Sequence, residues 1–226
     1  MKTQLRIASL SLLAALCLTL ASVPAFAQWN FNNGPCNCDT DALTINNNFV
    51  VSDSFLAGGS TNSFMFNAWE YPGDNLGIST SFLGWSISAT ENGSPVAGGS
   101  GIAQGGVNMT DTFLSINAYG YNMDKITVTG FNASTVANNT YWLNLYNAQV
   151  QSLNPVYWDE DSGVGCAGLN GTLQGCPNSA SDNGLGTIPS ESFTISGSST
   201  PEPSSLALFG SGVLGLGGLL RRRFLG

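Results

Sequence analysis

The chain has 226 residues, of which 9% are charged, and it contains no histidine. The lack of histidine excludes a Ser-His-Asp triad and a Cys-His nucleophile pair. Between residues 28 and 200, Lys125 is the only basic residue against thirteen acidic ones, so this part of the chain has a net charge of −12. Binding to nucleic acid requires Lys and Arg at the phosphates, and such a surface excludes it.

The first 27 residues have the three parts of a secretory signal peptide. Lys2 and Arg6 form a basic start, residues 7–20 are an apolar run, and Ala25-Phe26-Ala27 is a small-x-small ending. This order predicts an apolar helix that is removed by cleavage after Ala27. It leaves residues 28–199 as one domain, which is long enough to bury its own core.

The interior of the chain has the pattern of β-structure. Apolar and polar residues alternate strictly over 83–89, and Asn92-Gly93 follows as a hairpin-turn signal. Seven further strands are expected, over residues 43–51, 63–69, 112–118, 125–130, 141–146, 156–158 and 191–195. Loops are expected at 57–60, 97–101 and 105–106, where glycine is frequent. The pattern predicts a mainly β fold, a single sandwich or jelly roll.

Four cysteines remain after removal of the signal peptide, which predicts two disulfides in an exported chain. Cys166 and Cys176 would close a loop rich in Gly and Asn and stabilise it by about 3 kcal/mol. Cys36 and Cys38 are separated by one residue, which is a demanding geometry for a bridge. Cross-pairing between the two clusters is therefore an open alternative. A zinc site is disfavoured, because histidine is lacking and the spacing is not C-x-x-C.

An acidic run, Asp159-Glu160-Asp161, is the candidate metal site. Carboxylates in a loop suit Ca²⁺, the one cofactor that the sequence suggests. The same run offers Asp159 and Asp161 as a glycosidase-like pair, which needs one buried, protonated carboxyl group. The turn-forming sequence favours instead a solvated acidic turn with no catalytic residues.

Ten Trp and Tyr residues between positions 69 and 158 are candidates for stacking on sugar rings. They are Trp69, Tyr71, Trp85, Tyr119, Tyr121, Tyr141, Trp142, Tyr146, Tyr157 and Trp158. A sandwich also needs large side chains in its core, and core packing is the alternative for each of them. If alternation buries Tyr141, then Trp142 and Tyr146 face outward. Trp142, Tyr146 and Trp158 are the expected glycan contacts.

The last part of the chain, residues 200–226, has three elements in a fixed order. Pro201, Glu202 and Pro203 come first, an apolar run over 206–220 follows as a short expected helix, and Arg221, Arg222 and Arg223 come next. An apolar helix followed by arginines is held in the inner membrane with its basic end on the cytoplasmic side. The run is shorter than the roughly 20 residues of a typical span, which makes it a modest anchor.

These three elements closely resemble the PEP-CTERM sorting signal of exopolysaccharide-producing Gram-negative bacteria. The resemblance implies processing by exosortase, passage through the inner membrane, and a destination at the cell surface or in the extracellular matrix. It defines no activity for the domain at 28–199. We expect a non-catalytic surface or biofilm-matrix protein, associated with exopolysaccharide. The alternatives are a carbohydrate-binding module, with or without structural calcium, and, less favoured, a glycosidase.

Overall fold

The computed structural model describes residues 28–163, 168–171, 180–182 and 186–199, together with Gly210 and Gly212. Apart from Gly210 and Gly212, the signal-peptide helix and the apolar sorting helix expected from the sequence lie outside these residues. Within the described part of the chain, no helix has the length and hydropathy needed to cross a membrane. Residues 28–200 form one compact unit.

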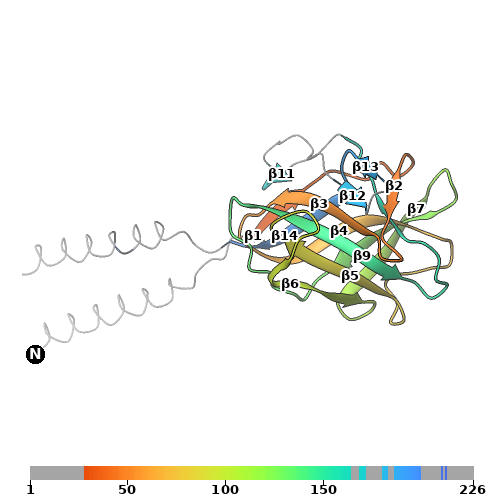
Figure 1. Ribbon diagram of the computed structural model, residues 1–226, viewed down its shortest axis with the longest axis horizontal. Coiled ribbons are helices and arrows are strands. Elements are labelled where there is room, and N and C mark those ends of the chain that lie inside the picture. The colour runs from red at the N-terminus through yellow and green to blue at the C-terminus, as the bar shows by residue number, and fades with distance from the viewer. Residues whose placement is uncertain are drawn as a thin grey trace, which may run out of the picture. The chain divides into compact units, whose positions relative to one another are not determined.

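Two antiparallel sheets pack against each other in a sandwich-like arrangement (Figure 1). The first sheet runs in the order β11 (Gly168–Leu169), β1 (Gln28–Asn32), β14 (Phe193–Ser198), β4 (Ser60–Glu70), β10 (Tyr157–Asp159) and β2 (Ala42–Thr44). On the other side of β4, this sheet continues through β8 (Asn122–Val128) to β7 (Met109–Ile116). Strand β4 is thus its centre, and it borders β14, β10 and β8.

The second sheet has six strands. Their order is β13 (Gly186–Ile188), β12 (Ala180–Asp182), β3 (Val50–Leu56), β9 (Thr140–Gln149), β5 (Phe82–Ser88) and β6 (Pro95–Gln104). The mainly β, sandwich-like fold expected from the sequence is therefore confirmed.

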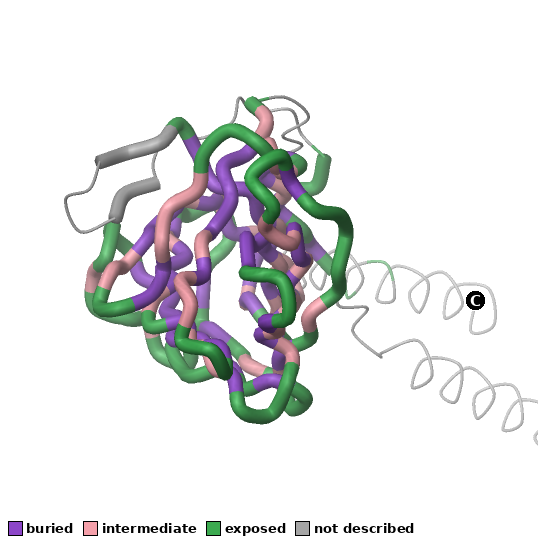
Figure 2. Tube along the Cα trace, turned by 90° about the vertical axis from the view of Figure 1, so that its right-hand side faces the viewer, coloured by how far each residue is buried: buried purple, intermediate pink, exposed green. Residues whose placement is uncertain are grey.

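The core lies between the sheets and follows the period-two alternation of the strands. In β4, Phe64, Phe66 and Ala68 are buried, and in β9 the buried residues include Leu143 and Leu145. Figure 2 shows buried segments through the middle of the domain and exposed segments at the turns. All of these core residues and both sheets belong to residues 28–199, so this segment has its own hydrophobic core.

The Asn-Gly hairpin is confirmed, because β5 and β6 pair on either side of it. The prediction of a loop at 97–101 is wrong, because these residues lie inside β6. Its glycines let a neighbouring side chain lie close: a Cβ at Gly101 would come 3.3 Å from the Trp85 ring. The strand expected at 43–51 is two strands, because Asn47 and Asn48 turn the chain with positive φ.

Asn144 holds together three strands on the outer face of the second sheet. Its side-chain oxygen accepts hydrogen bonds from Ser52 Oγ at 2.7 Å and from the Asn92 backbone N–H at 3.0 Å. Its Nδ2 donates to Ser86 Oγ at 3.0 Å and to Ser88 Oγ at 2.8 Å. The side chain is 1% exposed, so these partners replace its hydration.

The Asn144→Ala substitution should therefore lower the free energy of unfolding by about 2–3 kcal/mol, because it leaves several buried groups without partners. Urea unfolding of residues 28–199 measures this loss. The matched control is Asn62→Ala, at an exposed position of β4, which should change the stability by less than about 0.5 kcal/mol. Equal effects of the two substitutions would contradict the assignment.

Candidate functional site

The acidic run at 159–161 is not the solvated turn expected from the sequence. Asp159 is 0% exposed, Glu160 8% and Asp161 3%. Isolated antiparallel bridges pair Asp161 with Cys36 and Glu160 with Glu191, so the run is hydrogen-bonded to two other segments of the domain. Both members of the glycosidase-like pair are thus buried.

The structure does not bring together the three carboxylates of the predicted calcium site. Asp159 accepts hydrogen bonds from the Trp69 indole and the Cys38 N–H, and Asp161 accepts one from the Gly163 N–H at 2.5 Å. Among the described residues, the three carboxylates are not gathered within 4.8 Å of one another. Alternation along the chain sends Glu160 to the opposite side from its two neighbours.

Trp158 is fully buried and cannot contact a glycan, which corrects the expectation for this residue. Its indole N–H donates to the Ser192 carbonyl at 3.1 Å, and its ring packs edge-on against Phe66 and Phe193. Trp142 and Tyr146 are half-buried on the outer face of β9, on either side of Asn144. Their predicted contact with a glycan stays a prediction.

A different group of aromatic side chains surrounds an open cavity of about 260 Å³ at one end of the first sheet. We call this cavity the aromatic pocket. Its lining residues are Thr40, Asp41, Ala42, Trp69, Tyr119, Tyr121 and Tyr157.

Four separate parts of the chain build the aromatic pocket. Trp69 in β4 lies directly opposite Tyr157 in the register of β10. Tyr119 and Tyr121 come from the turn between β7 and β8, and residues 40–42 lead into β2, which also pairs with β10. Trp69 is out of phase with Phe64, Phe66 and Ala68, so alternation puts its ring on the outer face of the sheet.

The rings form one connected cluster. The centroids of Trp69 and Tyr119 are 5.7 Å apart with the planes nearly parallel, and those of Tyr121 and Tyr157 are 5.7 Å apart with an edge-to-face orientation. Tyr71 contacts Tyr121 edge-to-face at 4.8 Å and extends the cluster beyond the pocket. Tyr119 is 63% exposed, whereas Trp69 is 7% exposed. The pocket therefore has a buried indole as its floor and an accessible tyrosine at its rim.

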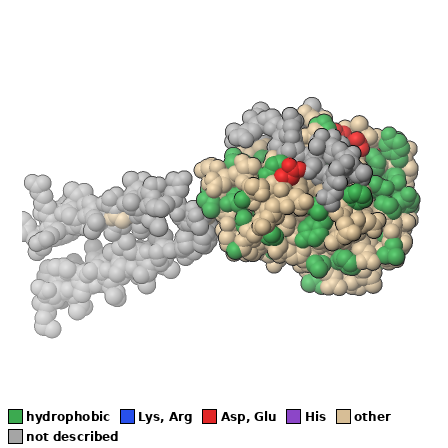
Figure 3. Space-filling view, in the orientation of Figure 1, with side chains coloured by type: hydrophobic (Ala, Val, Ile, Leu, Met, Phe, Trp, Pro, Cys, Tyr) green, Lys and Arg blue, Asp and Glu red, His purple; other side chains and the backbone are tan. Residues whose placement is uncertain are grey.

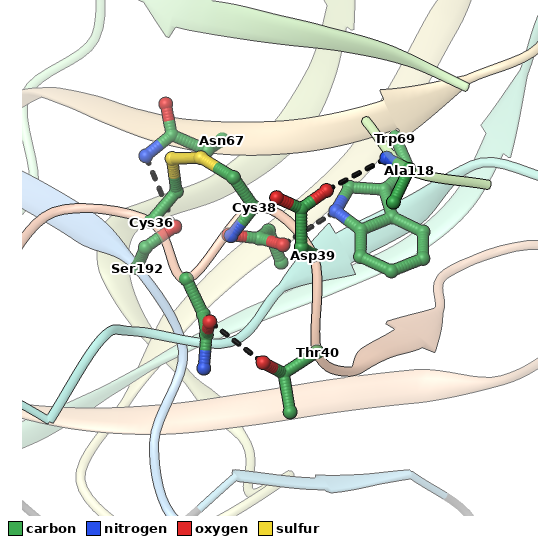
Figure 4. Close-up of a disulfide and its surroundings, with 10 residues drawn as sticks. Cys36, Cys38, Asp39, Thr40, Asn67, Trp69, Ala118 and Ser192 are labelled. Carbon is green, nitrogen blue, oxygen red and sulfur yellow. Dashed lines mark hydrogen bonds between the residues drawn. A yellow bond between two sulfur atoms is a disulfide. The ribbon is translucent and has the colours of Figure 1, made fainter. Parts of the chain in front are cut away.

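The turn that carries both tyrosines is fixed by Asn117. The Asn117 side-chain oxygen accepts hydrogen bonds from the backbone N–H groups of Tyr119 at 3.0 Å and Tyr121 at 2.9 Å. Asp39 Oδ1 accepts another from the Ala118 N–H at 2.7 Å, which ties this turn to the loop before β2 (Figure 4). The two tyrosines are thus held in place before any ligand binds.

The loop before β2 contains Cys36 and Cys38, which the structure joins in a disulfide, with their Cα atoms 5.0 Å apart (Figure 4). The disulfide expected between Cys166 and Cys176 lies outside the described residues. The Cys38 N–H donates to Asp159 Oδ2 at 3.1 Å, and Asp159 Oδ1 accepts from Trp69 Nε1. Asp159 therefore links the disulfide loop to the indole of the pocket floor.

Burial raises the pKa of Asp159 to about 7, although the donors at Cys38 and Trp69 oppose the rise. Near the pocket, the described acidic side chains include Asp39 and Asp41. On the face shown in Figure 3, hydrophobic side chains gather at the end of the domain where Figure 1 labels β7. A pocket of rings with acidic and hydroxyl groups at its edge suits a neutral, hydroxyl-rich ligand with an apolar face.

All of the pocket aromatics were among the ten candidates in the sequence, but the spacing alone did not select them. One sequence feature could have indicated the pocket: Tyr119-Gly-Tyr121 places two large rings in a turn. Side chains in a turn are not explained by packing in the core. The pairing of Trp69 with Tyr157 depends on strand register between segments 88 residues apart, which no local pattern reveals.

Residues 199–223 match the PEP-CTERM protein-sorting motif, which confirms the resemblance seen in the three C-terminal elements. Such a motif marks an exported protein that exosortase processes. No curated protein is significantly similar to the chain.

Proposed function

We propose that this exported protein acts without catalysis at the cell surface or in the exopolysaccharide matrix, and that its sandwich domain binds polysaccharide through the aromatic pocket. The observation that carries this proposal is the connected cluster of four rings, Trp69, Tyr119, Tyr121 and Tyr157, around an open cavity. Sugar rings present apolar C–H faces that pack on aromatic rings, and the hydroxyl groups take hydrogen bonds from polar side chains.

The charge of the domain narrows the class of ligand. The domain has a single lysine, and the exposed acids Asp39 and Asp41 lie near the pocket, so this end of the domain repels uronic-acid and phosphate-rich polymers. The pocket itself is lined by four aromatic residues and by Thr40, Asp41 and Ala42. We therefore place neutral polysaccharides first among the ligands, with the carboxylate of Asp41 and the hydroxyl of Thr40 as hydrogen-bonding groups.

The burial of the acidic run supports a non-catalytic role. Glycoside hydrolysis needs two carboxyl groups that flank the scissile bond, about 5–9 Å apart. Asp159, directly behind the pocket, is 0% exposed, and both of its oxygens accept hydrogen bonds from the protein. Asp159 therefore orients the indole of Trp69 rather than meeting a substrate.

The Tyr119→Ala and Tyr121→Ala substitutions should each weaken binding to neutral exopolysaccharide by about tenfold or more, as expected for side chains that supply 1–2 kcal/mol. The measurement is affinity electrophoresis of residues 28–199 in gels that contain exopolysaccharide purified from the producing strain. The double variant should migrate as it does in a gel without polysaccharide.

Two matched control variants distinguish binding in the aromatic pocket from nonspecific binding to exposed aromatic side chains. Phe113→Ala removes an exposed aromatic ring, 56% accessible, that does not line the pocket. Trp142→Ala tests the outer face of β9, which the sequence favoured. Both should retain binding, and loss of binding in Trp142→Ala with retention in Tyr119→Ala would refute the assignment of the pocket.

A further inference from the structure

A second group of acids lies at the inner face of the first sheet, away from the acidic run at 159–161. Glu70 ends β4, Asp111 lies in β7 and Asp124 lies in β8. One carboxylate oxygen from each lies within 4.8 Å of the others. The three strands are neighbours in the sheet, so the group is a product of strand register.

Alternation explains why these carboxylates point inward. Glu70 is in phase with the core residues Phe66 and Ala68 of β4, and Asp124 is in phase with Ile126 of β8. Glu70 is 0% exposed and Asp124 is 3% exposed. Each thus occupies a position that its strand otherwise gives to an apolar side chain.

The described protein groups do not satisfy these acids. Glu70 Oε1 and Asp124 Oδ2 are buried with no hydrogen-bond partner in the described part of the chain. One donor, the Leu76 N–H, is shared between Glu70 Oε2 at 3.2 Å and Asp111 Oδ2 at 3.1 Å. Lys125, the only lysine or arginine from 28 to 199, follows Asp124 directly and therefore points to the opposite face. Buried oxygens in this state need a proton or a cation.

The loop after β4 closes over the group. Leu76 is fully buried, and its neighbour Gly77 approaches Asp111 so closely that a Cβ there would come 2.8 Å from the Asp111 backbone nitrogen. The Leu76 N–H of this loop donates to both Glu70 and Asp111, so the loop lies directly against the acids.

We propose that Glu70, Asp111 and Asp124 bind one hard divalent cation, with calcium as the best match. Three carboxylates are ligands that Ca²⁺ prefers, and the set lacks the sulfur and imidazole that favour transition metals. The unpartnered oxygens of Glu70 and Asp124 supply the lone pairs. The ion would fasten the end of β4 to the β7–β8 hairpin, and this inference does not depend on glycan binding.

Isothermal titration of residues 28–199 with CaCl₂, after treatment with EDTA and removal of the chelator, tests the proposal. We expect one Ca²⁺ per chain and a rise of Tm by roughly 5–10 °C at a hundredfold excess over Kd. Glu70→Gln and Asp124→Asn should each weaken calcium binding at least tenfold, which reduces the Tm shift at the same calcium concentration to about half or less. If either variant fails to fold, Asp111→Asn, at the half-buried position, provides the same test.

Glu160→Gln is the matched control, because it removes an acid from the run that the sequence favoured as the metal site. It should bind calcium as the unchanged domain does. The absence of stoichiometric binding would show that protons alone neutralise the group and would overturn the proposal. Loss of binding in Glu160→Gln, with retention in the variants of Glu70, Asp111 and Asp124, would overturn it as well.

Discussion

Trp158→Ala should lower the free energy of unfolding of residues 28–199 by about 3–5 kcal/mol, the cost of removing a large aromatic side chain from a core. Trp158 is 0% exposed and packs against Phe66 and Phe193. The substitution also leaves the Ser192 carbonyl without its 3.1 Å indole donor. Urea unfolding, followed by circular dichroism, measures the loss.

Trp142→Ala is the matched control, because Trp142 is half-buried on the outer face of β9. It should cost about 1 kcal/mol or less. A Trp158→Ala variant that keeps its stability and loses only polysaccharide binding would contradict the placement of Trp158 in the core and restore it as a glycan contact.

The domain should be more stable near pH 5 than near pH 8. Burial raises the pKa of Asp53 to about 8, against opposing hydrogen bonds from Ser190 and the Glu191 backbone. Burial, followed by the charge of Asp53, raises the pKa of Glu191 well above its ordinary value. Neither carboxylate oxygen of Glu191 has a hydrogen-bond partner among the described residues. Other acids that act on Glu191 are Asp159, Glu160 and Asp41.

The sign follows from proton binding. Between the ordinary pKa of a carboxyl group and its raised pKa in the folded state, the folded domain holds a proton that the unfolded chain has released. The stabilisation is fully present below the unfolded pKa and is lost as the pH rises through the folded one. Each such proton lowers the free energy of unfolding by about 1.4 kcal/mol per pH unit in that window.

Urea unfolding at several pH values in EDTA measures this slope without interference from metal. Glu191→Gln should remove one proton from this linkage and so reduce the slope by about 1.4 kcal/mol per pH unit. It should raise the free energy of unfolding at pH 8 more than at pH 5. Glu91→Gln, at an exposed turn position, should leave the slope unchanged. A stability that rises from pH 5 to pH 8 would contradict the buried, protonated state of Glu191.

Much of the fold was predictable from the alternation of apolar and polar residues, because a strand that is buried on one face has an apolar residue at every second position. The strand at 83–89 and the inward residues Leu143 and Leu145 followed from it directly. The edge strand β6 was missed because its glycine and serine residues lack that pattern, and they pair through the backbone instead. The Asn47-Asn48 turn was missed because the apolar residues on both sides read as one run.

The candidate sites were less predictable, because both depend on contacts between distant segments. Trp69 meets Tyr157 only through the pairing of β4 with β10, and Glu70 meets Asp124 only through the pairing of β4 with β8. A local signal did exist for the acids: Glu70 and Asp124 occupy the apolar phase of their strands. The acidic run at 159–161 attracted attention because its members are adjacent, although adjacency in a strand separates side chains.

NMR chemical-shift mapping of residues 28–199, titrated with oligosaccharides from partial hydrolysis of the strain's exopolysaccharide, tests whether polysaccharide binds in the aromatic pocket. We expect the largest shifts on the Trp69 indole N–H, on Tyr119 and Tyr121 in the β7–β8 turn, on Tyr157, and on residues 40–42. Shifts confined to the face of Trp142 and Tyr146, or no shifts at saturating oligosaccharide, would contradict it.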